Sequence, residues 1–222
     1  MLTMHNDSTP EVIRAVRLAL GRTSPLTAPP TPPQIDETIT RLVHTDIGLP
    51  ELFTRTAQAN KMGVQTVSAE ELAPRLVDFL RDSNVKTIAL ADSKLLKDLC
   101  VPESLRKAGL QVRTWDQLTL DELYDIDCGI TDVWAAVAEV GALVVRGSPE
   151  HGRAISLVPP IHVAVVEPKN LMPDLVDLFQ RLPSTPNEKF VLITGPSKTA
   201  DIEMNLVTGV HGPGVVQVFL LQ

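Results

Sequence analysis

A polar segment near the carboxyl end of the chain combines residue types that bind anions. Residues 195–203 read Gly-Pro-Ser-Lys-Thr-Ala-Asp-Ile-Glu and follow an apolar run that predicts a buried strand. Backbone N–H groups at a strand–loop–helix junction point outward and attract negative groups. We call residues 195–203 the loop segment, and its candidate ligand-binding residues are Gly195, Ser197, Lys198, Thr199, Asp201 and Glu203. The competing interpretation is that Ser197, Thr199 and Asp201 only cap the following helix.

A glycine-rich turn precedes the last apolar run of the chain. Residues 209–214 read Gly-Val-His-Gly-Pro-Gly, and the three glycines permit unusual dihedral angles or close approach to a ligand. Histidine is a residue type that serves in acid–base catalysis, so His211 is either a general acid or base or a hydrogen-bonded structural residue. His211 and Gly212 join the candidate site. We expect the loop segment and this glycine-rich turn to converge on one pocket whose exposed amides accept a negative group.

Three further polar residues lie within or beside apolar runs. His162 starts an apolar run after two prolines, and Thr131 ends a short run. Each belongs either to a ligand site or to the core. Glu139 lies between Ala138 and Val140, where a carboxylate is costly to bury unless it is paired. Glu139 and His211 are therefore the candidate catalytic residues, and His162 and Thr131 are candidate ligand-binding residues.

Several other chemistries are disfavoured by the residue pattern. Lys198-Thr199 lacks the glycines of a Walker loop, because Leu192 and Ser197 occupy their positions. Gly-x-Ser-x-Gly and Gly-x-Gly-x-x-Gly motifs do not occur. Two cysteines, Cys100 and Cys128, fit neither a disulfide scaffold nor a Cys-x-x-Cys site, and an iron–sulfur cluster usually needs four thiolates. We expect no bound metal and no directly bound cofactor, so that any electron transfer occurs on a partner.

Composition indicates a globular chain that forms one large domain or one domain with an appendage. The 222 residues include 20 Lys and Arg against 27 Asp and Glu, giving a net charge of −7 without a basic cluster. Binding to nucleic acid or to an anionic membrane is therefore disfavoured. No apolar window is long enough to span a membrane, and residues 1–13 lack the features of a signal peptide. We expect a cytoplasmic location.

The amino-terminal part of the chain differs from the rest. Apolar residues at Val12, Ile13, Val16 and Leu20 predict a helix over residues 8–20. Five prolines follow between Pro25 and Pro33. They favour a semi-rigid linker over the alternative, a proline-rich ligand for an aromatic groove on a partner. We therefore expect residues 1–33 to form a helix and linker, and residues 34–222 to form an α/β domain.

The first half of that domain alternates between helical and strand patterns. Helices are expected over 35–46, 50–62, 68–82, 92–100 and 118–125, and strands over 63–67, 85–91 and 110–115. Ser68 and Glu71 have the spacing of a capping box. This alternation is typical of a largely parallel sheet flanked by helices.

The middle of the domain breaks this alternation. After a strand end at 128–131 and a predicted helix over 132–140, three strands are expected over 141–147, 153–158 and 162–168. The gaps are too short for parallel crossovers, so we expect these neighbours to be antiparallel. A helix over 171–182 and strands over 190–194 and 215–221 complete the domain, which predicts an α/β fold with a mixed sheet.

The loop segment followed by His211-Gly212-Pro213 resembles the carboxyl-terminal signature of the LUD (lactate-utilization) domain family. Residues 40–222 are similar to the lactate-utilization protein C family, including its Pro-x-His strand at Pro160-Ile161-His162. Two departures occur. Val140-Gly141-Ala142 replaces the usual Thr-Gly-Thr, and Lys198 stands where the family often has Arg, which exchanges a bidentate grip for a point charge.

The resemblance implies a three-layer α/β/α sandwich with a mixed sheet, like that of CoA transferases and ribose-5-phosphate isomerase. It also implies an accessory role in oxidising L-lactate to pyruvate beside iron–sulfur partner proteins. The anion or partner would bind between the loop segment and the glycine-rich turn. The alternative is a stand-alone enzyme of CoA-transferase or sugar-phosphate-isomerase type, with Glu139 as base or nucleophile.

Overall fold

The computed structural model describes residues 11–22, 36, 47–148, 152–182, 189–199, 207–209 and 211–222. Contacts within the chain divide it into two compact units, Met1–Asp36 and Glu37–Gln222. The proline-rich segment and, apart from Asp36, the predicted helix over 35–46 lie outside the described residues. The predicted domain boundary after residue 33 therefore stays a prediction.

The first unit contains helix α1 (Glu11–Ala19), which agrees with the helix expected over residues 8–20. None of its residues is buried, and Val12, Ile13 and Val16 are all exposed. These apolar side chains thus contribute no buried core within the described part of the first unit.

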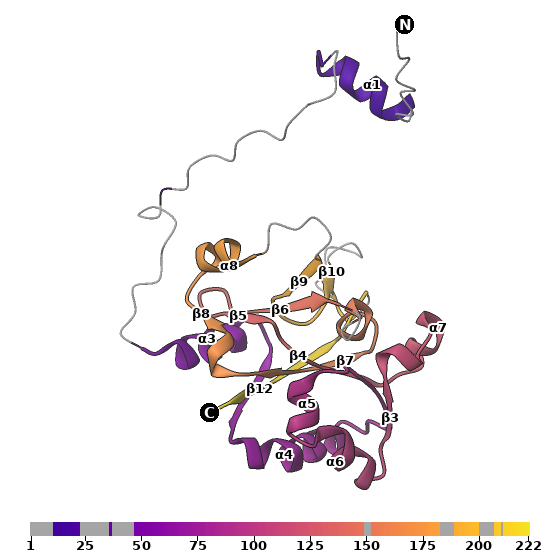
Figure 1. Ribbon diagram of the computed structural model, residues 1–222, viewed down its shortest axis with the longest axis vertical. Helices are drawn as coiled ribbons and strands as arrows, with labels where there is room; N and C mark the ends of the chain where they lie inside the picture. Colours follow the sequence, from indigo (N-terminus) through magenta and orange to yellow (C-terminus); the bar gives the residue numbers. More distant parts are fainter. Residues whose placement is uncertain are drawn as a thin grey trace, which may run out of the picture. The chain divides into compact units, whose positions relative to one another are not determined.

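Six parallel strands form the central sheet of the second unit, in the order β1-β12-β7-β4-β2-β3. They are β1 (Gly63–Val67), β2 (Thr87–Leu90), β3 (Gln111–Thr114), β4 (Cys128–Asp132), β7 (Ile161–Val166) and β12 (Val215–Leu221). Figure 1 shows β12, β7 and β4 running beside one another through the middle of this unit. A parallel sheet covered on both faces needs near-continuous apolar strands, as in β2 and β7.

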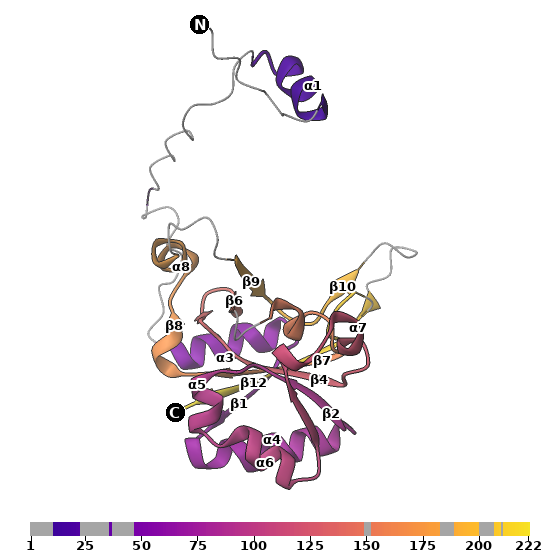
Figure 2. The same cartoon turned by 45° about the vertical axis from the view of Figure 1, so that its right-hand side comes forward.

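One face of the central sheet is covered by α4 (Ala69–Asp82), α5 (Lys94–Asp98) and α6 (Val101–Lys107). Figure 2 shows α4 and α6 on one side of the central strands and α3, β6 and β9 on the other. The capping box that opens α4 is confirmed, since the Glu71 amide donates to Ser68 Oγ and Glu71 Oε2 accepts from the Ser68 amide at 3.0 Å.

The other face is covered by a helix and by a second, four-stranded sheet in the order β8-β5-β6-β9. These elements are α3 (Leu49–Ala59), β5 (Ala135–Val137), β6 (Ala142–Gly147), β8 (Leu171–Met172) and β9 (Lys189–Ile193). The outer face of the second sheet packs against α8 (Leu175–Arg181). In this sheet β6 is antiparallel to β5 and β9, whereas β8 is parallel to β5.

The α/β class with helices flanking a mostly parallel sheet is confirmed. The mixed strand directions belong to the second sheet, whereas the central sheet is wholly parallel. The prediction that residues 141–147, 153–158 and 162–168 form successive antiparallel strands was wrong, because 153–158 begin with a helical turn and the other two stretches lie in different sheets. The chain crosses from β4 to β7 through β5, β6 and the helical turn η2 (Arg153–Ser156), which together are long enough for a parallel connection.

Two predicted elements also differ in type. Residues 132–140, expected to be helical, contain the end of β4 and strand β5. Residues 153–158, expected to be a strand, begin with η2. The alanines of β5 are fully buried and pair with β6, so packing between layers overrides their helix propensity.

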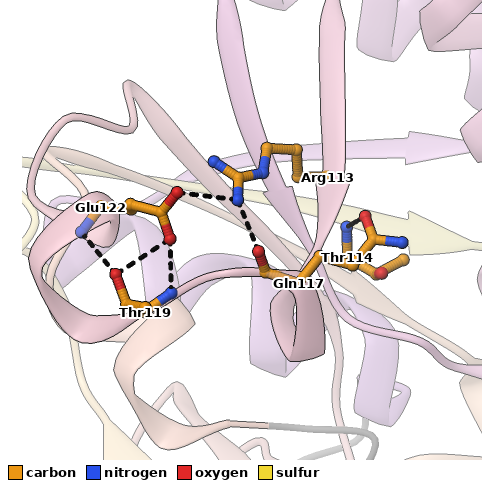
Figure 3. A network of polar contacts seen from close by, with 5 residues as sticks. All are labelled: Arg113, Thr114, Gln117, Thr119 and Glu122. Atoms are coloured by element: carbon orange, nitrogen blue, oxygen red, sulfur yellow. Dashed lines mark hydrogen bonds and ion pairs between the residues drawn. The ribbon is translucent and has the colours of Figure 1, made fainter.

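A polar network fastens the β3 edge of the central sheet (Figure 3). Arg113 Nη2 donates to Glu122 Oε1 at 2.9 Å and also contacts the Gln117 carbonyl. Glu122 Oε2 accepts from the Thr119 amide at 2.8 Å and from its hydroxyl at 2.9 Å. These bonds, led by the one from the Thr119 amide, lower the pKa of Glu122 to about 2. Gln117 and Glu122 belong to the short elements η1 (Trp115–Gln117) and α7 (Leu120–Leu123). Another short element, η3 (Pro168–Asn170), follows β7.

Candidate functional site

The loop segment and the glycine-rich turn lie against each other. Strand β10 (Lys198–Thr199) of the loop segment forms an antiparallel pair with β11 (Val207–Thr208), which directly precedes the glycine-rich turn. The Ser197 amide donates to the Pro213 carbonyl at 2.8 Å, and the Gly209 amide donates to the Ser197 carbonyl at 2.9 Å. Ser197 is therefore bonded to both ends of the glycine-rich turn.

At two positions of this site, a glycine leaves room for another segment of the chain to lie close to the backbone. Gly195 has a φ of +123°, and a Cβ there would lie 2.4 Å from the carbonyl oxygen of Asn60 at the end of α3. A Cβ on Gly212 would lie 3.2 Å from the Cβ of Ser197 and 3.4 Å from the carbonyl oxygen of Leu157. A side chain at Gly195 would clash, and one at Gly212 would push the two segments apart.

The expected source of anion-binding amides is only partly present. Lys198 and Thr199 lie in β10, so the predicted helix does not begin at these residues, and the Ser197 amide is already bonded to Pro213. The prediction that the backbone amides of this loop are exposed was therefore wrong for Ser197, because its N–H is bonded to the glycine-rich turn. The side chains of Lys198 and His211 are exposed. Asp201 and Glu203 lie outside the described residues, and of Thr199 only the backbone is described.

The site lies at the amino ends of the central strands. The amides of Gly214 and Val215 donate to the Pro160 carbonyl at 2.9 and 3.3 Å. Pro160 directly precedes β7 and Val215 begins β12, so these bonds fasten the glycine-rich turn where two parallel strands start. Ligands of open α/β sheets generally bind at the opposite, carboxyl edge.

His162 and Thr131 form a buried polar pair on adjacent strands. Neither side chain is exposed, and His162 Nε2 lies 3.0 Å from Thr131 Oγ1. His162 points to the same face of β7 as Ala164 and Val166, which pack toward α3 and the second sheet. Burial lowers the pKa of His162 to about 4, so its imidazole is neutral at pH 7. Among the described residues, His162 Nδ1 has no hydrogen-bond partner.

Glu139 lies in the connection between β5 and β6. Its Oε2 accepts from the Leu175 amide at 3.4 Å, at the start of α8. The flanking carbonyls are held by α3, because Thr56 Oγ1 donates to Ala138 and Asn60 Nδ2 donates to Val140, each at 2.7 Å. The Glu139 carboxylate thus accepts a hydrogen bond from the first turn of α8. The catalytic role predicted for Glu139 stays a prediction.

Sequence reasoning missed a cavity of about 490 Å³ at the carboxyl edge of the central sheet. Its lining includes Asp92, Asp132 and Glu167, which lie at or just beyond the ends of β2, β4 and β7. Asp92 pairs with Lys97 at 2.5 Å, and Glu167 pairs with Lys169 at 2.8 Å. The signal that would have indicated this edge is an acidic residue directly after three separate apolar runs.

Metal and thiol chemistry find little support in the part of the chain that the structure describes. The described residues contain no group of three or more His, Cys, Asp or Glu side chains that could hold a metal ion. Cys100 is exposed, whereas Cys128 is buried, which raises the pKa of its thiol. The helices within the described ranges are all too short or too polar to cross a membrane.

The layered α/β architecture is similar to that of a solved DUF162 family protein from Deinococcus radiodurans. The TM-score is 0.57 at 20% sequence identity, over 78% of this chain and 96% of that protein. This likeness concerns the fold alone.

The LUD domain family model matches residues 50–221, and the chain therefore belongs to the LUD domain family. Lactate utilization protein C of Halalkalibacterium halodurans is 37% identical over 117 residues, which cover 46% of this chain and 49% of that protein. Lactate utilization protein C 1 of Bacillus mycoides is 29% identical over 167 residues, 68% of this chain and 69% of that protein. The first of these matches spans about half the length of the relative.

Proposed function

We propose that this chain acts in lactate utilization, as an accessory subunit of a system that oxidises L-lactate to pyruvate. Membership of the LUD domain family, together with relatives named lactate utilization protein C, carries this proposal. The chain's own role is to bind a small anion or an acidic group of a partner protein.

The binding surface in this proposal is formed by the loop segment and the glycine-rich turn. The bonds of Ser197 to Pro213 and Gly209 support it, because they hold the two segments as one unit. Because the Ser197 amide is occupied, a carboxylate at this surface is held by side chains. The exposed ammonium group of Lys198 supplies the positive charge, and exposed His211 supplies a second polar group.

Partner proteins carry the redox cofactors in this proposal. Oxidation of lactate to pyruvate removes two electrons and two protons, so an electron acceptor is required. Two cysteines are too few for the usual four-thiolate iron–sulfur cluster, and Cys128 is buried. We therefore assign the iron–sulfur clusters to partner subunits and no directly bound cofactor to this chain.

Growth on L-lactate as the sole carbon source tests the role. Deleting the gene should abolish growth on lactate but not on glucose, and the tagged wild-type chain should restore growth and copurify with iron–sulfur proteins. Lys198→Ala should restore growth poorly, whereas Lys107→Ala, at an exposed position on α6, should act as wild type. Normal growth of the deletion strain on lactate would contradict the proposal.

A further inference from the structure

The cavity at the carboxyl edge of the central sheet lies where open α/β sheets bind ligands. From β2 the chain continues to its neighbour β3 on one side, whereas from β4 it continues to its neighbour β7 on the other side. The strand order therefore reverses between β2 and β4, and the crevice beyond such a reversal is the usual ligand site. The cavity, of about 490 Å³, is lined there by Asp92 and Asp132, and we call it the carboxyl-edge cavity.

Strand register brings acidic residues of three neighbouring strands together in its wall. Leu90 of β2 pairs with Ile130 of β4, so Asp92 and Asp132, each two residues further on, lie level on strands about 4.8 Å apart. Because side chains alternate along a strand, Asp132 shares the face of Ile130, which packs toward α4, α5 and α6. Glu167 follows β7 directly and lines the same cavity. The wall is thus acidic across β2, β4 and β7.

The carboxylates of this wall lie deeper than the lysines that pair with them. The Glu167 side chain is 24% exposed against 72% for its partner Lys169, and Asp92 is 39% exposed against 56% for Lys97. Exposed ion pairs stabilise a protein little, so a cationic ligand can displace these flexible lysines into water. The lining as a whole is net negative, with Asp92, Asp98, Asp132 and Glu167 against Lys94 and Lys169. It therefore suits a positive group and repels an anion.

A buried hydroxyl group in the lining has an unused proton. Ser93 is 4% exposed and lines the cavity, and its Oγ accepts from the Leu96 amide at 3.2 Å. Within the described ranges this is the one hydrogen bond of the Ser93 hydroxyl, so its proton has no acceptor there. A buried donor without an acceptor costs free energy. An oxygen atom of a ligand in the cavity would supply the missing acceptor.

We propose that the carboxyl-edge cavity binds a small amino alcohol. Its ammonium group lies against the carboxylates of Glu167 and Asp92, and its hydroxyl oxygen accepts from Ser93. The apolar side chain of Leu95, also in the lining, contacts the carbon chain. A volume of about 490 Å³ lies within the range of small-molecule sites, about 300–1,000 Å³. This site goes beyond the proposed function, because it lies at the other ends of the central strands and takes a cation.

Amide chemical-shift mapping of the full chain in phosphate buffer at pH 7 tests the ligand class with three compounds of similar shape. In 2-amino-1,3-propanediol both groups are present, glycerol has a hydroxyl in place of the ammonium, and 2-aminopropane lacks the hydroxyls. The amino alcohol should give saturable shifts at Ser93 and Asp132. Each of the other two should bind about tenfold more weakly, because each loses a hydrogen bond to the lining.

Three results of this titration would overturn the proposal. Equal affinity for glycerol would mean that charge plays no part. Shifts of the same size at the exposed carboxylates of α4 would mean only non-specific attraction of a cation. Unmoved amides at Ser93 and Asp132 would mean that the cavity binds no ligand of this class.

Two variants test the assigned residues. Glu167→Gln keeps the size of the side chain but removes its charge, so affinity for the amino alcohol should fall about tenfold. Glu103→Gln, at an exposed position on α6, is the matched control, because it changes the net charge equally and should bind as wild type. Ser93→Ala should bind 2-amino-1,3-propanediol and 2-aminopropane equally, which loss of its cap on α5 would not by itself cause. Unchanged affinity in Glu167→Gln, or a retained preference in Ser93→Ala, would contradict the proposal.

Discussion

A single main-chain hydrogen bond of 2.8 Å, from the Ser197 amide to the Pro213 carbonyl, joins the loop segment to the glycine-rich turn. This bond assembles the candidate site and removes one of its expected backbone donors. In the proposed function, recognition of an acid at this surface would therefore depend on exposed side chains such as Lys198.

Gly129 should tolerate no side chain. Gly129→Ala would place a Cβ 2.0 Å from the Ile155 carbonyl oxygen, so η2 must shift, and we expect a loss of about 3 kcal/mol in the free energy of unfolding. Gly48→Ala is the matched control, because its Cβ would only touch Pro50 at 3.6 Å, and it should cost less than about 1 kcal/mol. Urea denaturation measures both values, and equal stabilities would contradict the tight contact.

Asp127 should stabilise the starts of β2 and β4. Its Oδ2 accepts from the amides of Lys86 and Thr87 at 2.8 and 2.9 Å and from the Thr87 hydroxyl at 2.9 Å. Asp127→Ala leaves these donors unpaired, so we expect a loss of about 2 kcal/mol at pH 7. Asp78→Ala, at an exposed position on α4, should stay within about 0.5 kcal/mol of wild type.

The stabilisation by Asp127 should depend on pH. Burial raises the pKa of Asp127, but the hydrogen bonds from Lys86 and Thr87 outweigh this effect, so its pKa in the folded state is lowered. The contribution is therefore fully present above the unfolded-state pKa of about 4 and is lost as the pH falls toward the folded-state pKa. Urea denaturation at pH 7 and at pH 3 should show the gap between wild type and Asp127→Ala narrowing in acid. A constant gap would argue against an ionised Asp127 in the folded state.

Glu122 should remain ionised in unusually acidic solution. The hydrogen bonds from the Thr119 amide and hydroxyl and from Arg113 lower its pKa to about 2. Carbon-13 NMR of the side-chain carboxyl groups should therefore show Glu122 titrating well below the other glutamates. Thr119→Ala removes the hydroxyl donor and should raise this pKa, while Leu120→Ala, at an exposed position on α7, should leave it unchanged. An ordinary pKa in wild type would show that the network of Figure 3 is not formed in solution.

Glu139→Gln should have little effect. The amide oxygen of glutamine still accepts from the Leu175 N–H, so stability should stay within about 0.5 kcal/mol of wild type, and growth on lactate should be normal. Loss of growth with an intact fold, checked by circular dichroism and thermal unfolding, would favour the alternative of a stand-alone enzyme that uses this carboxylate.

Elements with strong local signals could be predicted from the sequence. Ser68 and Glu71 define the start of α4, and the apolar run of β2 fits a strand covered on both faces. Residues 132–140 could not be predicted locally, because hydrogen bonds from Thr56 and Asn60 hold this segment against α3. The direction of β7 could not be predicted either, since strands β5 and β6 and the turn η2, rather than a long helix, lie in its crossover from β4.

The contact between the loop segment and the glycine-rich turn was predictable from the sequence, but its hydrogen bonding was not. The polar residues of the loop segment and the glycines of the turn indicated that the two segments act together. The sequence could not show that Pro213 would occupy the Ser197 amide, or that one nitrogen of His162 would have no hydrogen-bond partner among the described residues. Both depend on contacts between residues far apart in the chain.

The central claim is that the loop segment and the glycine-rich turn form one ligand-binding unit at the amino ends of the central strands. Amide chemical-shift mapping of the full chain during titration with L-lactate and pyruvate tests it most directly. We predict saturable shifts at Ser197, Lys198, Gly209 and Gly212, with Ser93 and Asp132 at the carboxyl-edge cavity unchanged. Shifts confined to Ser93, Asp132 and their neighbours, or no shifts at all, would contradict the claim.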